Sequence, residues 1–120
     1  MQKVAIAAAA FVLLAAGAAQ AADSYTWTGV GTNVTGSSKC PTYKMTINLD
    51  VNGTAVTGHF QQEGRDARHF ETTLGAGGAI KAKAAVGGGG SMDVTGTISP
   101  AKNEILLDGY CKFGGPLTKK

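Results

Sequence analysis

YKMTINLDVNGTAVTGHFQQ, residues 43–62, is the stretch that decides the fold class of this chain. Its first half alternates apolar and polar residues, which is the pattern of a strand with one buried face. Asn52-Gly53 follows, a dipeptide typical of the two-residue type I′ turn of a hairpin. With these residues at the tip, apolar side chains of both strands share one face, and the predicted partners are Leu49 with Val56, Ile47 with Gly58 and Met45 with Phe60.

The rest of the chain repeats this alternation. The period of two recurs in five further stretches, residues 24–30, 67–74, 80–86, 92–98 and 105–113. No stretch after residue 21 shows the 3.6-residue period of a helix. The sequence therefore predicts one all-β domain over residues 22–120, an antiparallel meander of about seven strands that ends in an irregular tail, residues 114–120.

The two cysteines stand near opposite ends of this meander. Cys40 precedes the second predicted strand, and Cys111 lies in the last one. A disulfide between them would close a loop of about 70 residues, which on the chain-entropy model stabilises the fold by about 4 kcal/mol. It would also bring the ends of the meander together, as in a closed barrel or a tight sandwich. Two free thiols or a shared metal ion are the alternatives.

Residues 1–21 have the features of a signal peptide. Lys3 supplies a short basic region, residues 4–16 are apolar, and Ala19-Gln20-Ala21 is an A-x-A cleavage site. The apolar run is shorter than the ~20 residues that a membrane-spanning helix needs. We therefore expect a periplasmic or secreted protein without a membrane span, in a compartment where disulfides persist.

The charge of the chain argues against a nucleic-acid partner. The formal charge of +3 falls to +2 when Lys3 leaves with the signal peptide. The chain has no cluster of arginines and no run of aromatic residues on a basic face, which nucleic-acid binding would favour. We expect a monomer that binds a partner protein or a small ligand and uses no cofactor.

Metal-ligand chemistry is confined to one face of the second predicted hairpin. If Phe60 pairs with Phe70, His59 lies opposite Glu71, and His69 lies diagonally beside them on the same outer face. Two imidazoles and a carboxylate are zinc-ligand types. His59, His69 and Glu71 therefore form a candidate metal site, and the alternative is that they are ordinary solvent-facing residues of a hairpin.

The sequence does not predict an enzyme. Nucleophilic catalysis needs Ser or Cys beside a base, whereas the cysteines are expected to pair and the serines fall in loops or turns. Glycoside hydrolysis needs two acids that point inward, yet these acids take outward or turn positions: Asp50, Asp93, Glu104 and Asp108. The glycine run at residues 87–90 lacks the Gly-Lys-Ser/Thr ending of a phosphate-binding loop.

The spacing of tryptophan, glycine and cysteine resembles that of small exported all-β proteins of bacteria. The residues that carry the resemblance are Trp27-Thr28-Gly29, Cys40, Val56-Thr57-Gly58 and Tyr110-Cys111. This resemblance implies no activity. The segment Met45-Thr46-Ile47 with its partner strand is also similar to an early hairpin of avidin-type barrels, but a biotin pocket needs several tryptophans and this chain has one.

The leading functional hypothesis is a non-enzymatic protein that binds a partner protein or a small ligand through its loops or the mouth of a barrel. The alternatives are metal handling by the histidine face, inhibition of an enzyme, and a structural role in the cell envelope. In size and layout the chain is similar to periplasmic inhibitors of proteases or lysozyme. The two candidate loops, residues 31–41 and 87–91, carry no aromatic residue to fill a partner's cleft.

Overall fold

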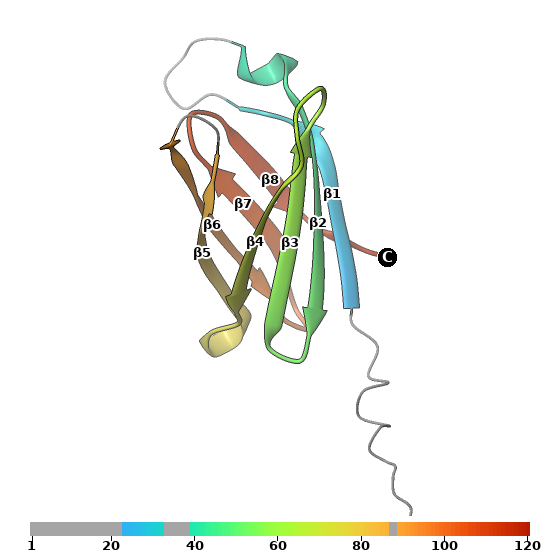
Figure 1. The fold of residues 1–120 in the computed structure, drawn as a ribbon. Helices are drawn as coiled ribbons and strands as arrows, with labels where there is room; N and C mark the ends of the chain where they lie inside the picture. The colour runs from blue at the N-terminus through green and yellow to red at the C-terminus, as the bar shows by residue number, and fades with distance from the viewer. Residues whose placement is uncertain (1–22, 33–38, 87–88) are drawn as a thin grey trace, which may run out of the picture.

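Nine strands form two antiparallel sheets in the computed structural model, which describes residues 23–32, 39–86 and 89–120 (Figure 1). The predicted signal peptide, residues 1–21, lies outside the described residues. The strands are β1 (Asp23–Val30), β2 (Lys44–Asn52), β3 (Ala55–Gln62), β4 (Arg68–Thr73), β5 (Ala79–Ala85), β6 (Ser91–Ile98), β7 (Asn103–Asp108), β8 (Lys112–Pro116) and β9 (Thr118–Lys119). Two short 3-10 segments, η2 (Cys40–Thr42) and η3 (Ala76–Gly78), lie in the connections.

The two sheets face each other with the core between them (Figure 1). One sheet has the strand order β4-β3-β2-β1-β9, and the other has the order β5-β6-β7-β8. Every hydrogen-bonded neighbour pair is antiparallel. The predictions of an all-β antiparallel fold and of the Cys40–Cys111 disulfide are therefore confirmed.

The sheets meet at two joins and do not close into one barrel. Between β4 and β5, the hydroxyl group of Thr72 donates a hydrogen bond to the carbonyl oxygen of Lys81 at 3.2 Å. On the other side, Thr32 and Lys112 exchange two backbone hydrogen bonds of 2.8 and 2.9 Å. Neither join is a continuous ladder within the described residues, so the closed barrel, one of the two predicted forms, is not confirmed.

The core follows the period of two that the sequence shows. In β2 the apolar residues alternate with side chains that reach solvent. Both sheets supply the side chains that are most completely buried, which are Ile47, Leu49 and Val56 from one and Val94, Ile105 and Leu107 from the other. Because strand pairing and burial obey the same period, the hydrophobic pattern sets which face of each strand points inward.

The first hairpin turns one residue later than predicted, at Gly53-Thr54. Leu49 pairs with Gly58 instead of Val56, and the other predicted pairs move by the same two residues. Gly53 has a φ of 66°, but no non-glycine residue in the described ranges has a positive φ. A type I′ turn needs two positive φ values, so this turn is of a different type. A shift of two residues leaves the buried faces unchanged.

The hairpin of β3 and β4 also differs from its predicted register by two residues. Phe70 pairs with Gly58, and Phe60 pairs with Arg68. A Cβ atom on Gly58 would collide with the ring of Phe70. The glycine therefore provides the space in which the ring of Phe70 packs across the neighbouring strand, and Phe60 and Phe70 are diagonal neighbours instead of the predicted opposite pair. The rings of Phe60 and Phe70 lie 6.5 Å apart between centroids.

The last predicted strand, residues 105–113, is two strands in the structure. β7 ends at Asp108 and β8 begins at Lys112, and between them the amide of Gly109 donates a hydrogen bond to the carbonyl oxygen of Cys111 at 3.0 Å. In the pairing of β6 with β7, Ile98 lies opposite Asn103 and Gly96 lies opposite Ile105. The sequence did not indicate the turn between β7 and β8, because the apolar alternation continues through Phe113.

The tail is ordered, contrary to the prediction of an irregular segment at residues 114–120. It completes β8 and forms β9, which pairs with β1. Gly114, with a φ of 147°, brings β8 so close to β7 that a Cβ atom would collide with the carbonyl group of Ile105. A sequence rich in glycine reads as irregular, but here the missing side chains permit close strand contact.

Candidate functional site

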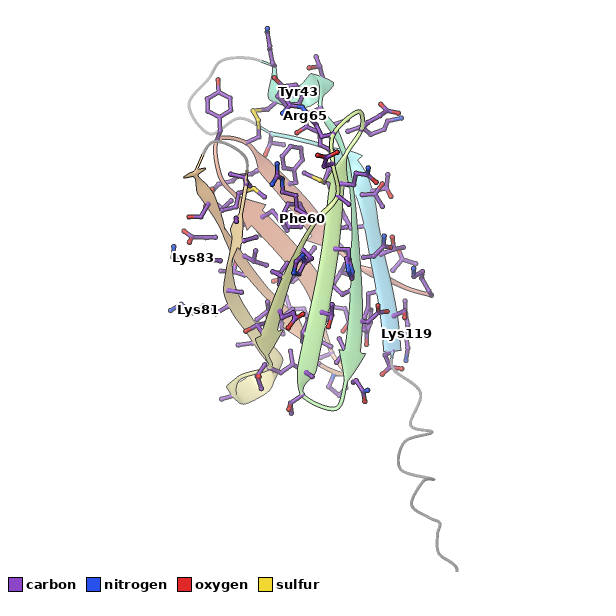
Figure 2. All side chains as sticks on the ribbon, viewed as in Figure 1. Tyr43, Phe60, Arg65, Lys81, Lys83 and Lys119 are labelled. Atoms are coloured by element: carbon purple, nitrogen blue, oxygen red, sulfur yellow. A yellow bond between two sulfur atoms is a disulfide. The ribbon has the colours of Figure 1, made fainter. Side chains whose placement is uncertain are left out.

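A cavity of about 650 Å³ opens at one end of the sandwich, which we call the cavity end. It lies where β2, β3 and β8 meet the start of β6 and the turns at residues 62–68 and 109–111. Figure 2 shows three of its lining residues, Tyr43, Phe60 and Arg65, toward the same end of the molecule. Side chains of both sheets line the cavity, so the sandwich itself positions the site.

The floor of the cavity is apolar. Met45 and Phe60 come from one sheet, Met92 and Phe113 come from the other, and all four are buried. Each occupies one of the inward positions of its strand nearest this end, where the facing sheets no longer fill the space between them. Gly109 adds no side chain here, and a Cβ atom on it would lie 2.6 Å from Cγ of Met92. The result is an apolar hollow that reaches the surface.

The rim carries three charged side chains: Arg65 and Asp66 come from the turn between β3 and β4, and Arg68 is the first residue of β4. The turn is fixed by two hydrogen bonds. The amide of Arg65 donates to the carbonyl oxygen of Gln62 at 2.9 Å, and the side-chain amide of Gln61 donates to the carbonyl oxygen of Arg65 at 2.8 Å. Within the described part of the chain, neither arginine forms an ion pair within 4.0 Å. Their guanidinium groups are available to a ligand at the mouth.

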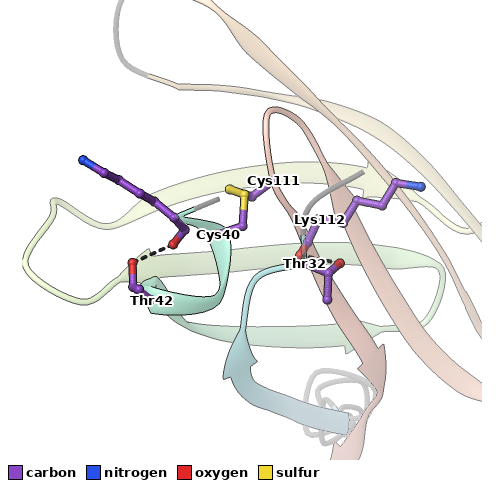
Figure 3. The surroundings of a disulfide bond; sticks show 6 residues. Thr32, Cys40, Thr42, Cys111 and Lys112 are labelled. Carbon is purple, nitrogen blue, oxygen red and sulfur yellow. Dashed lines mark hydrogen bonds between the residues drawn. A yellow bond between two sulfur atoms is a disulfide. The ribbon is translucent and has the colours of Figure 1, made fainter. Parts of the chain in front are cut away.

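The disulfide fixes the same end of the molecule. Cys40 and Cys111 are both buried, and their bond ties η2 to the turn between β7 and β8 (Figure 3). Thr32 and Lys112 exchange their backbone hydrogen bonds nearby. Cys111 also lines the cavity. The cavity wall is therefore held by a covalent bond as well as by strand pairing.

Tyr110 is a rim residue that the sequence reasoning missed. The sequence predicts it within the strand of residues 105–113. In the structure it lies in the turn between β7 and β8, and 77% of its surface is exposed. Its neighbour Cys111 is anchored by the disulfide, so the ring is carried by a fixed turn. Gly109 is the residue that could have indicated the turn, because it interrupts the run of bulky side chains directly before Tyr110.

The predicted metal-ligand set is only partly brought together. His59 and His69 pair directly across β3 and β4, with ring centroids 6.2 Å apart. Glu71 pairs with Thr57, so the predicted placement of His59 opposite Glu71 is wrong. The cause is the two-residue shift that places Phe70 opposite Gly58. No group of three metal-ligand residues in position to hold an ion occurs in the described ranges. Metal binding by this face stays a prediction, and it now has two imidazoles to support it.

Two features bear on catalytic chemistry. Both cysteines of the chain are in the disulfide, so no thiol is free to act as a nucleophile. Among residues 23–32, 39–86 and 89–120 no polar or charged residue is fully buried. The absence of an enzymatic function stays a prediction.

Comparisons of this chain with models of protein families, with curated proteins and with solved structures found no match. In the described part of the chain, no helix has the length and apolar character needed to cross a membrane.

Proposed function

We propose that this protein is a non-enzymatic binding protein that takes a small ligand with an apolar body into the cavity. The observation that carries the proposal is the cavity itself, an open hollow of about 650 Å³ between the two sheets. Ligand pockets in proteins commonly have volumes of about 300–1,000 Å³, with mainly apolar walls and a few polar groups at defined places. The floor and the rim described above have this composition.

The disulfide supports a site of action outside the cytoplasm, in the periplasm or beyond the cell. Disulfides form and persist in oxidising compartments and are rare in the cytosol. The same bond holds the cavity wall. A binding site that depends on this bond would be formed only after export.

The proposal is tested with N-phenyl-1-naphthylamine, an uncharged dye whose fluorescence rises in apolar surroundings. We expect the disulfide-bonded protein to bind it, and we expect Gln62→Trp to reduce binding because Gln62 lines the cavity and an indole ring there would occupy the mouth. The matched control is Thr57→Trp, a substitution on the same strand at a position outside the cavity lining. Absence of dye binding by the wild-type protein, or equal loss in both variants, would contradict the proposal.

A second candidate function, recognition of a partner protein, is favoured by Tyr110. Exposed tyrosines on rigid turns are common anchors of protein interfaces. If the turn contacts a protein, Tyr110→Ser should remove one defined partner from the material that co-purifies with the chain, and Gln62→Trp should retain it. If Gln62→Trp lost the partner and Tyr110→Ser retained it, the partner would depend on the cavity. That result would count against this candidate.

A further inference from the structure

We infer that the ligand of this cavity is an amphiphile with one anionic head group, whose alkyl chain lies on the apolar floor while its head lies between Arg65 and Arg68. This inference rests on the proposed binding function and names the chemical class of the ligand. It follows from two separate observations, the side chains of the floor and the charges of the rim.

The floor suits a flexible chain. Two of its four buried side chains are methionines, Met45 and Met92, one from each sheet. Methionine has three rotatable bonds and a polarisable sulfur atom, so it adapts to ligands without a fixed shape. Phe60 and Phe113 complete the apolar surface. Because no polar or charged residue of the described ranges is fully buried, the floor offers no buried group that would require a polar ligand body.

The rim suits an anion. Arg65 lies in the β3–β4 turn and Arg68 begins β4, and both residues line the one cavity, so their guanidinium groups can reach the same ligand. A guanidinium group binds a carboxylate or a phosphate through two parallel hydrogen bonds, which is why arginine is favoured for such head groups. Asp66 lies on the same rim and opposes this charge. Among the described residues, Asp66 forms no ion pair with either arginine. The three side chains together give the rim a net positive charge.

Arg68 also connects the head-group position to the floor. It pairs with Phe60 across β3 and β4, and its side chain is half-buried whereas Arg65 is exposed. Arg68 therefore places a positive charge directly beside the apolar floor. An amphiphile needs this arrangement, because its charged head group is bonded to its alkyl chain. A ligand without a charge would gain nothing from Arg68, and a ligand charged at both ends would have to place one charge on the apolar floor.

The test is displacement of the naphthylamine dye by two probes with the same chain and opposite head groups, decanoate and decyltrimethylammonium. We expect decanoate to displace the dye at a concentration about tenfold lower than the cation does, because two partly exposed charge-assisted contacts are each worth a few-fold in affinity. In Arg65→Gln/Arg68→Gln this preference should disappear. Asp66→Asn should strengthen decanoate binding. The matched control is Lys81→Gln, a loss of one positive charge from β5 at a position outside the lining, which should change nothing.

Equal displacement by both probes in the wild-type protein would overturn this inference and leave the proposed function standing. Failure of the dye to bind would overturn both. The source of the head group is resolved by sedimentation with vesicles of phosphatidylglycerol. Sedimentation that the double arginine variant loses would place the anionic head in a membrane surface. Displacement by decanoate without sedimentation would place it on a free acid.

Discussion

The two ends of the sandwich are formed by the same strands and differ in how their connections cover the core. At the cavity end, the described residues leave a hollow whose lining includes Phe60 and Met92. At the opposite end, the backbone of η3 lies so close to β6 that a Cβ atom on Gly78 would collide with the carbonyl group of Ile98. The amide of Leu74 there donates to the carbonyl oxygen of Thr54 at 2.8 Å and ties two connections together.

The comparison shows that the strands supply the frame and the connections decide whether an end is open. The closed end uses backbone contacts at glycine. The open end is held by the disulfide, and both of its cysteines belong to the buried core. The open end also carries the exposed ring of Tyr110 and the arginines of the rim, whereas the closed end carries η3. The residues of the candidate site therefore lie at the end where the sandwich leaves a hollow.

The largest expected effect is at the cavity end. Replacing both Cys40 and Cys111 with Ala should lower the free energy of unfolding by about 4 kcal/mol, because the bond closes a loop with a sequence separation of 71. Urea denaturation of the oxidised wild type and of the variant measures the difference. Dye binding should fall as well, since Cys111 lines the cavity. A variant with wild-type stability would show that the disulfide does not hold this end.

The next largest effect is at the closed end. Gly78→Ala should destabilise the fold by about 3 kcal/mol, because it combines a positive φ with a backbone collision. Gly77→Ala is the matched control. Gly77 also has a positive φ, of 71°, but no atom lies within 4 Å of the added Cβ, so about 1 kcal/mol is expected. Equal losses in thermal or urea denaturation would contradict the close packing of η3 on Ile98.

A small effect on stability is expected at Tyr110. Because its ring is 77% exposed, Tyr110→Ser should change the free energy of unfolding by no more than about 0.5 kcal/mol. Denaturation in urea measures this value. A larger loss would mean that the ring packs against the sandwich, and would remove the argument that it is presented to a partner.

The smallest effect concerns the histidine face, which belongs to neither end. Titration calorimetry with zinc should show weak binding at most, because His59 and His69 form a pair without a third ligand in the described ranges. Any weak heat should vanish in His59→Ala. Tight binding of one zinc ion that persists in this variant would place a metal site elsewhere on the chain.

The sequence was sufficient for the properties that follow from period and composition. The alternation in residues 43–62 predicted the faces of β2 and β3 correctly, and the two cysteines predicted the disulfide. The registers were wrong by two residues, because period alone does not distinguish shifts that keep the same face inward. The Phe70 ring over Gly58 decides one of them, and such packing is a property of three dimensions.

The candidate site was less accessible to prediction than the fold. The predicted mouth of a barrel indicated that an end of the structure would matter, but the lining residues come from five strands and the connections between them, and no local pattern groups these residues together. The alternation of residues 105–113 continues past Gly109 to Phe113, and it concealed the turn that presents Tyr110. Arg65 falls between two predicted strands and Arg68 falls within the predicted strand of residues 67–74. No sequence pattern connects either arginine with the floor of the cavity.

The most direct test of the account is a two-dimensional amide NMR titration of the disulfide-bonded protein with the naphthylamine dye. Binding in the cavity predicts that the largest shift changes occur at floor and rim residues, including Met45, Phe60, Met92 and Arg68, while η3 and the Gly53-Thr54 turn stay unchanged. Shift changes centred on the closed end, or spread evenly over both sheets, would contradict the assignment of binding to the cavity end.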